Sequence, residues 1–208
     1  MNDKDSFDWC RARARKGIWL DIGAHVGNYT RAMSTLTDWV YAFEASPETA
    51  GLLQTRCEDL SNVTVVHAAV AHTQGTAELY IEQTSGPTSE GNTINPFKAE
   101  SGRFGHTLTN WVSVPAMSID YWAQTNNVTN ITLAKIDVEG AEQWVIAGML
   151  ETLKSNTMLI TMEQHQMIDT GLIQDLVNSA GYKITRDGST ECRMTIDVPG
   201  TGYIIVPR

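Results

Sequence analysis

Four acidic side chains stand where apolar segments of this sequence end. Asp21 and Glu44 close the first two such segments, and Asp137 and Glu163 close two later ones. If the segments are parallel strands, their carboxyl ends meet at one edge of a sheet, where the ligands of such folds bind. Carboxylates at that edge can accept hydrogen bonds, take up a proton or cap a helix. The pattern therefore predicts a ligand site lined by acids, with helix capping as the alternative for any single one.

A glycine-containing loop follows the first acid. Gly23 and Gly27 lie four residues apart, so the backbone can turn sharply and approach a ligand without a Cβ atom in the way. The amides of the helix that follows favour a nucleotide-like ligand. A dinucleotide pattern needs glycines where His25 and Asn28 stand, and no Gly-Lys-Ser or Gly-Lys-Thr follows as in a P-loop. The loop therefore does not match a pyrophosphate or triphosphate cradle.

The two acids nearest this loop indicate which nucleotide it binds. Glu44 ends the second segment at about the distance, roughly 20 residues on, at which doubly wound folds place an acid against a ribose diol. Asp21 stands directly before the glycines, where a carboxylate repels a pyrophosphate but attracts an ammonium group. The methionine end of S-adenosylmethionine carries such a group. The residues therefore favour S-adenosylmethionine over a nicotinamide dinucleotide.

Three segments resemble those of the FkbM-type S-adenosylmethionine-dependent methyltransferases. They are residues 19–30, residues 42–47 and, most specifically, residues 135–142 (Lys-Ile-Asp-Val-Glu-Gly-Ala-Glu) with Gly148 beyond them. The resemblance extends from about residue 17 to residue 206. It implies a Rossmann-like class I methyltransferase, an α/β fold with a doubly wound, mostly parallel seven-stranded sheet whose last strand is antiparallel.

The same resemblance implies a set of cofactor contacts. The glycine loop is expected at the methionine end, Glu44 at the ribose, and the two alanines after the third strand near the adenine, although no acid for the adenine amine stands there. The residues predicted to contact the cofactor are Asp21, Gly23, Ala24, His25, Gly27, Asn28, Glu44, Ala45, Ser46, Ala68, Ala69 and Asp137.

Catalytic residues are expected near the end of the fourth central strand. Methyl transfer from a sulfonium requires alignment of the reactants and, for a hydroxyl acceptor, removal of a proton. Asp137 is the first choice for the base, and Lys135 could steer an anionic acceptor or stabilise an alkoxide. The other candidates for the base are Glu139, which equally suits a first-turn position beside a helix dipole, Glu163 and His165. Carboxylates with one histidine could also hold a divalent ion, which the spacing leaves open.

We expect methylation of a hydroxyl on a small molecule, natural product or sugar, because FkbM-type relatives act mostly on such groups. Nitrogen acceptors remain possible. Two alternatives of other classes stay open at this point. One is an NAD-dependent oxidoreductase of Rossmann type, and the other is a non-catalytic nucleotide-binding module, because fold does not imply function.

The elements that must position these residues follow from hydrophobic runs and their punctuation. Strands alternate with helices, which predicts a parallel sheet covered on both faces, and the last two strands are expected to form an antiparallel hairpin. The predicted strands span residues 17–23, 39–44, 63–71, 75–82, 131–137, 157–162, 182–185 and 202–206. The first of the longer predicted helices follows the glycine loop and ends near residue 36, and the others span residues 47–59, 141–153 and 168–180. Residues 84–110 lack such patterns, and we expect a lid or a substrate loop there, with plain disorder as the alternative.

Length and composition indicate one globular domain over residues 1–208, with residues 1–16 as a lead-in. The chain carries 24 acidic against 15 basic side chains, a net charge of -9, which disfavours nucleic acid as a partner. The sequence has neither an apolar run that could span a membrane nor a signal-peptide pattern, so we expect a cytoplasmic protein. Three cysteines without paired spacing predict neither a disulfide framework nor a zinc site.

Overall fold

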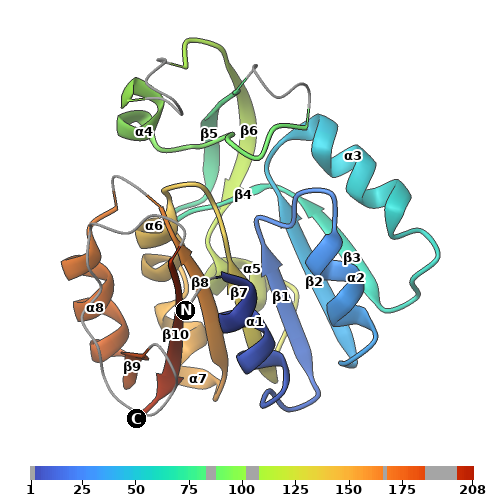
Figure 1. Cartoon of the computed structure of the whole chain (residues 1–208), viewed down its shortest axis with the longest axis vertical. Helices are drawn as coiled ribbons and strands as arrows, with labels where there is room; N and C mark the ends of the chain where they lie inside the picture. Colours follow the sequence, from blue (N-terminus) through green and yellow to red (C-terminus); the bar gives the residue numbers. More distant parts are fainter. Residues whose placement is uncertain (1–2, 83–87, 102–107, 166–167, 186–200) are drawn as a thin grey trace.

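A seven-stranded sheet forms the centre of the structure, a computed structural model that describes residues 3–82, 88–101, 108–165, 168–185 and 201–208. The strand order is β3-β2-β1-β7-β8-β10-β9 (Figure 1). The last strand, β10, pairs antiparallel with both neighbours, whereas the pairs from β3 across to β8 are parallel. This arrangement confirms the predicted doubly wound sheet. The strands are β1 (Ile18–Ile22), β2 (Trp39–Glu44), β3 (Val63–His67), β7 (Ile131–Ile136), β8 (Leu159–Gln164), β9 (Tyr182–Thr185) and β10 (Thr201–Pro207).

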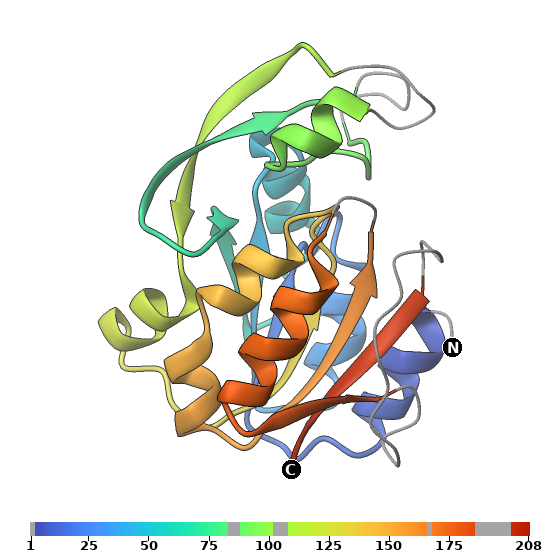
Figure 2. The ribbon, with the colours of Figure 1, turned by 90° about the vertical axis from the view of Figure 1, so that its left-hand side faces the viewer.

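Helices cover both faces of this sheet, because alternate side chains of its central strands point to opposite sides. Trp19 packs with Phe7 of α1 and Met33 of α2 on one face, whereas Leu20 and Ile22 belong to the larger core on the other. Figure 2 shows α6 and α8 against that second face. The helices around the sheet are α1 (Asp3–Arg11), α2 (Asn28–Ser34), α3 (Pro47–Arg56), α5 (Ile119–Thr125), α6 (Glu142–Ala147), α7 (Leu150–Ser155) and α8 (Thr170–Ser179). Within the described ranges, no helix has both the length and the apolar character needed to cross a bilayer.

Local sequence signals account for several of these boundaries. Every residue of β7 is buried, as expected for an apolar strand in the middle of a sheet covered on both faces. Ser46 caps α3 by accepting the amide of Thr49, and Pro47 occupies the first helical position, as predicted. Gly181, with φ of +82°, follows the end of α8.

A second, three-stranded sheet stands above the carboxyl edge of the main sheet, and the sequence did not predict it as a separate unit. It has the order β4-β6-β5, formed by β4 (Ala69–Val70), β6 (Trp111–Met117) and β5 (Gly75–Tyr80). Residues 63–71 were predicted as one strand, but β3 pairs with β2, whereas β4 pairs with β6 in the small sheet. The prediction was wrong because a continuous apolar run does not reveal that its two ends have different partners.

Two further predictions need correction. Residues 141–153 form α6 and α7 rather than one helix, since the chain breaks at Gly148, which packs closely against Ala71. The segment 84–110 is not wholly irregular, because it contains the helix α4 (Pro96–Ser101). Residues 83–87 and 102–107 of that region, and 186–200 of the predicted polar turn, lie outside the described residues.

The packing at Gly148 allows a direct test. A Cβ atom there would lie 2.2 Å from the backbone oxygen of Ala71, whereas a Cβ at Gly51, an exposed position within α3, would meet nothing within 4 Å. We expect Gly148→Ala to lower the free energy of unfolding by about 1–3 kcal/mol through overpacking. Gly51→Ala should raise it by roughly 0.5–1 kcal/mol through helix propensity. Urea unfolding measures both, and equal stability of the two variants would contradict the assigned packing.

Candidate functional site

A cavity of about 340 Å³ lies between the carboxyl edge of the main sheet and the small sheet. This volume falls in the range, roughly 300–1,000 Å³, of small-molecule sites. Most of the residues predicted for the site meet there. Those that line the cavity are Gly23, Ala24, His25, Asn28, Glu44, Ala45, Ala68, Ala69, Lys135, Asp137, Glu139 and Glu163. Asp21, Gly27, Ser46 and His165 do not line it.

The glycine loop passes directly over the end of β7. Gly23 has φ of +80°, and a Cβ atom at this residue would lie 1.7 Å from the backbone oxygen of Asp137. The amide of Asp137 in turn donates to the carbonyl of Ile22 at 3.0 Å. Only glycine fits this crossing, because any side chain would meet backbone rather than a flexible group. The crossing brings the end of β1 and the end of β7 to the same wall of the cavity.

The loop uses its own amides within the protein. The amides of Gly23 and Ala24 both donate to the carbonyl of Phe43, and the amide of Gly27 donates to Ala24. The amide of His25 donates to a carboxylate oxygen of Glu44 at 2.9 Å. A pyrophosphate cradle needs such amides to point at the ligand. The hydrogen bonding therefore does not favour the dinucleotide-binding alternative.

Glu44 is held in place by backbone amides on both carboxylate oxygens. One oxygen accepts from His25, and the other accepts from the amide of Ser46, each at 2.9 Å. Burial raises the pKa of Glu44, and the two amide hydrogen bonds oppose that rise. The carboxylate is thereby oriented at the cavity wall, with acceptor capacity left on each oxygen.

Asp21 lies beneath the loop rather than at the cavity wall. It is fully buried, and one of its oxygens accepts the hydroxyl of Thr30 at 2.6 Å. The ammonium of Lys135 lies 3.9 Å from its other oxygen, 3.0 Å from Asp137 and 4.7 Å from the centre of the Tyr29 ring. The structure thus places Lys135 between two carboxylates. Asp21 therefore does not contact the cavity itself, and its charge acts there through Lys135.

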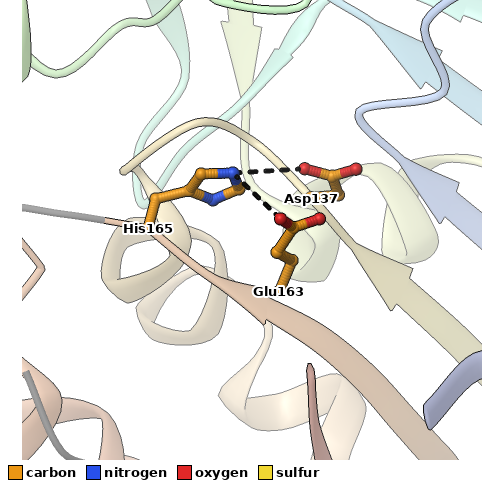
Figure 3. A group of neighbouring side chains, drawn as sticks. All are labelled: Asp137, Glu163 and His165. Carbon is orange, nitrogen blue, oxygen red and sulfur yellow. Dashed lines mark ion pairs between the residues drawn. The ribbon is translucent and has the colours of Figure 1, made fainter. Parts of the chain in front are cut away.

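His165 connects the acids at the far side of the site. Its Nδ1 lies 2.6 Å from Glu142, and its Nε2 lies 3.3 Å from Glu139, 3.7 Å from Asp137 and 3.8 Å from Glu163. Figure 3 shows the carboxylates of Asp137 and Glu163 on the same side of the imidazole, both facing one ring nitrogen. Sequence reasoning assigned no role to Glu142, although it closes the most specific of the family-like segments.

The charges in this group shift each other's titration. Burial lowers the pKa of His165, but the carboxylates of Glu139 and Glu142 outweigh burial and raise it to about 10. Burial raises the pKa of Glu139, but His165 and Lys98 outweigh it and lower the value to about 2. His165 therefore holds a proton at neutral pH in this arrangement, which does not suit the predicted role of a general base.

Residues 88–98, which we call the covering segment, close the cavity from above. Ser89, Glu90, Asn92 and Ile94 line it. The carbonyl of Thr88 lies 2.8 Å from Nε2 of His25 on the glycine loop. On the other side, Thr93 and Asn95 donate to the carbonyls of Glu139 and Gly140 at 2.7 and 2.6 Å, and Lys98 forms an ion pair with Glu139. Sequence reasoning expected a lid here but named none of these contacts.

Solved structures share this fold. A putative methyltransferase from Streptococcus mutans, solved in complex with SAH, matches with a TM-score of 0.55 and 12% identity over 100% of this chain and 98% of its own. An FkbM methyltransferase from Methylobacillus flagellatus matches with a TM-score of 0.56 and 15% identity over 92% of this chain and 43% of its own. The fold is therefore that of the α/β methyltransferases.

The family follows from the sequence match. Residues 21–184 match the family model of the methyltransferase FkbM domain, so this chain belongs to that family. The predicted resemblance is confirmed.

Two curated relatives carry more specific names. The 2-O-methyltransferase NoeI of Sinorhizobium fredii is 24% identical over 74% of this chain, and the hexuronic acid methyltransferase AglP of Haloferax volcanii is 25% identical over 78% of it. The aligned part spans 66% and 62% of these relatives, less than two thirds of either.

The ion pair between Lys98 and Glu139 should hold the covering segment in place. Replacing Lys98 by methionine leaves a largely buried carboxylate without this partner, at a cost of at least about 1.4 kcal/mol, or tenfold in a local opening equilibrium. We expect amide hydrogen exchange of residues 93–99 to become about tenfold faster. Lys154→Met is the matched control, because Lys154 pairs with Glu151 on an exposed surface. Unchanged exchange in Lys98→Met would show that the other contacts suffice.

Proposed function

We propose that this chain transfers a methyl group from S-adenosylmethionine to a hydroxyl oxygen of a sugar or a similar small molecule. The observation that carries the proposal is the composition of one cavity. Glu44 and the Gly23 loop form one wall, and the carboxylates at the ends of β7 and β8 form another. Family membership and the names of the two relatives support it.

The residues present fit this cofactor. Each carboxylate oxygen of Glu44 keeps acceptor capacity for one hydroxyl of a ribose diol. Gly23 lets the backbone of its loop stay close to a bound methionine end, and Ala68 and Ala69 offer small side chains beside an adenine. When bound, S-adenosylmethionine supplies a methyl group made electrophilic by a sulfonium.

The chain's own part in the reaction is alignment and removal of a proton. Asp137 stands where β7 ends, and the ammonium of Lys135 holds one of its carboxylate oxygens at 3.0 Å. We assign Asp137 the role of accepting the proton that the acceptor hydroxyl loses as the new C–O bond forms. The pairing of Lys135 with Asp137 and Asp21 supports a role in orienting Asp137 rather than in attracting an anionic acceptor.

The charge of the cavity favours a neutral acceptor. Its lining includes Glu44, Glu90, Asp137, Glu139 and Glu163 against Lys135 as the one lysine or arginine of the lining in the described ranges. A carboxylate on the acceptor would be repelled at these distances, since the cavity is partly shielded from water. We therefore propose a neutral hydroxylated acceptor for this chain, although the relative AglP is named for a hexuronic acid.

The acceptor class can be tested with a labelled methyl donor. We expect transfer to neutral glycosides and at least tenfold weaker transfer to the corresponding uronates at neutral pH, corresponding to about 1.4 kcal/mol of charge repulsion. Label incorporation into each acceptor measures this preference. A preference for uronates would contradict the charge argument, and no incorporation into any hydroxylated acceptor would contradict the proposed reaction.

Substitutions in the two walls of the cavity should affect different properties, cofactor binding for Glu44 and turnover for Asp137. Glu44→Gln removes a charge-assisted contact to the ribose and should weaken binding of S-adenosylhomocysteine about 10-fold to 100-fold, as measured by calorimetry. The exposed acid Glu48 provides the matched control, Glu48→Gln. Uptake of NAD in place of S-adenosylhomocysteine would reverse the choice of cofactor.

Asp137→Asn should still bind S-adenosylhomocysteine but lower turnover about 10²-fold to 10⁴-fold, the usual contribution of general base catalysis. Glu58→Gln, on the exposed surface, serves as the control for turnover. If Asp137→Asn turned over at the rate of the unaltered chain, Asp137 would not be the base.

A further inference from the structure

We propose that Asp137, Glu163 and His165 bind a divalent metal ion at the wall of the cavity. The three side chains come from the end of β7, from β8 and from the residue that follows β8 (Figure 3). Each offers one ligand atom, and these atoms all lie within 4.8 Å of one another. A carboxylate pair with one imidazole is a donor set that divalent ions bind.

The distances suit an ion better than direct hydrogen bonds. Nε2 of His165 lies 3.7 Å from Asp137 and 3.8 Å from Glu163, beyond ordinary hydrogen-bond length. Ligands about 2.1 Å from one ion lie between about 3 Å apart, when adjacent, and about 4.2 Å apart, when opposite. Both observed distances fall inside that interval. An ion could therefore bind between these atoms with small side-chain adjustments.

Glu142 supplies an independent indication that a cation is needed here. Its side chain is fully buried, and one carboxylate oxygen lies 2.6 Å from Nδ1 of His165. The other oxygen has no hydrogen-bond partner within the described part of the chain. Carboxylate, imidazole and metal in this order are a recurring arrangement, in which the carboxylate fixes the ring so that Nε2 faces the ion. Here Nε2 faces Asp137, Glu139 and Glu163.

The balance of charge around the ring leaves room for a divalent ion. Four carboxylates face or neighbour the ring, and the two lysines paired with them are Lys135 and Lys98. Carboxylates gathered this closely in a site partly shielded from water repel one another, and a further cation reduces that repulsion. A proton on Nε2 would reach Glu139 at 3.3 Å but neither of the two more distant carboxylates. A metal ion would satisfy both of those at once.

The ligand set and its position indicate the kind of ion and its use. One nitrogen with two oxygens suits Mn²⁺ and neighbouring transition metals better than Ca²⁺, which prefers oxygen alone. Asp137 and Glu163 line the cavity, so further coordination positions would face it. Provided that the proposed function holds, adjacent hydroxyls of the acceptor would take those positions, which would orient the acceptor by two contacts. With the ion bound, Asp137 would serve as its ligand, and the ion would lower the pKa of the reacting hydroxyl beside it.

Binding of Mn²⁺ alone to the full chain tests the site. After treatment with a chelator and without methyl donor, the chain should bind Mn²⁺ saturably, with one ion per chain. The loss of the electron paramagnetic resonance signal of free Mn²⁺ measures this binding. Glu163→Gln and His165→Asn should each weaken this binding at least tenfold. Glu142→Gln should weaken it about 10-fold to 100-fold as a positioning residue. Glu90→Gln, which removes another acid of the cavity wall, should weaken this binding far less than Glu163→Gln does.

Three results would overturn the proposal. They are the absence of saturable binding at millimolar Mn²⁺, equal affinity in Glu163→Gln, and the same loss in Glu90→Gln as in Glu163→Gln. Circular dichroism and melting curves establish that each variant is folded, and Glu163→Gln decides the question if His165→Asn does not fold. Calorimetry with S-adenosylhomocysteine on the same preparations separates the two proposals. Binding of S-adenosylhomocysteine without binding of Mn²⁺ refutes the metal site alone. Binding of Mn²⁺ without binding of S-adenosylhomocysteine refutes the methyl transfer alone.

Discussion

The candidate site depends on one close approach of backbone to backbone. The loop after β1 crosses the end of β7 at Gly23, where a Cβ atom would lie 1.7 Å from the carbonyl of Asp137. This crossing brings Asp21, beneath the loop, and Asp137, beside it, to the same lysine. A side chain at position 23 would separate the two strand ends and with them the two walls of the cavity. The glycine therefore sets the geometry on which the binding of both reactants would rest.

Charge placement is the second constraint, because the cavity gathers carboxylates that would repel one another if left unpaired. The protein manages them with cations from three different parts of the chain: Lys135 from β7, His165 after β8 and Lys98 from α4. Lys98 links closure of the covering segment to the electrostatics of the acids below it. Glu139 and His165 shift each other's pKa in opposite directions, to about 2 for Glu139 and about 10 for His165.

Sequence reasoning predicted the main sheet more accurately than the elements above it. The strands of the main sheet are apolar runs that end in turns, and their βα alternation determines the sheet they form. The small sheet and the break at Gly148 escaped prediction, since both depend on which distant segment a residue meets. Ala69 pairs in register with Ala116, and Gly148 packs on Ala71, contacts that no local pattern encodes. Glu142 and Lys98 were missed for the same reason.

By itself, the sequence determined the family, the order of the elements and the acids at the strand ends, because these follow from residue types and spacing along one strand or turn. Only the tertiary structure decided which of those acids reach the cavity. Asp21 is buried beneath the loop, whereas Glu44, Asp137 and Glu163 line the wall. It also decided that His165 lies among four carboxylates that come from different parts of the chain. The physical reason is that burial and charge pairing depend on distances through space, and separation along the chain does not specify those distances.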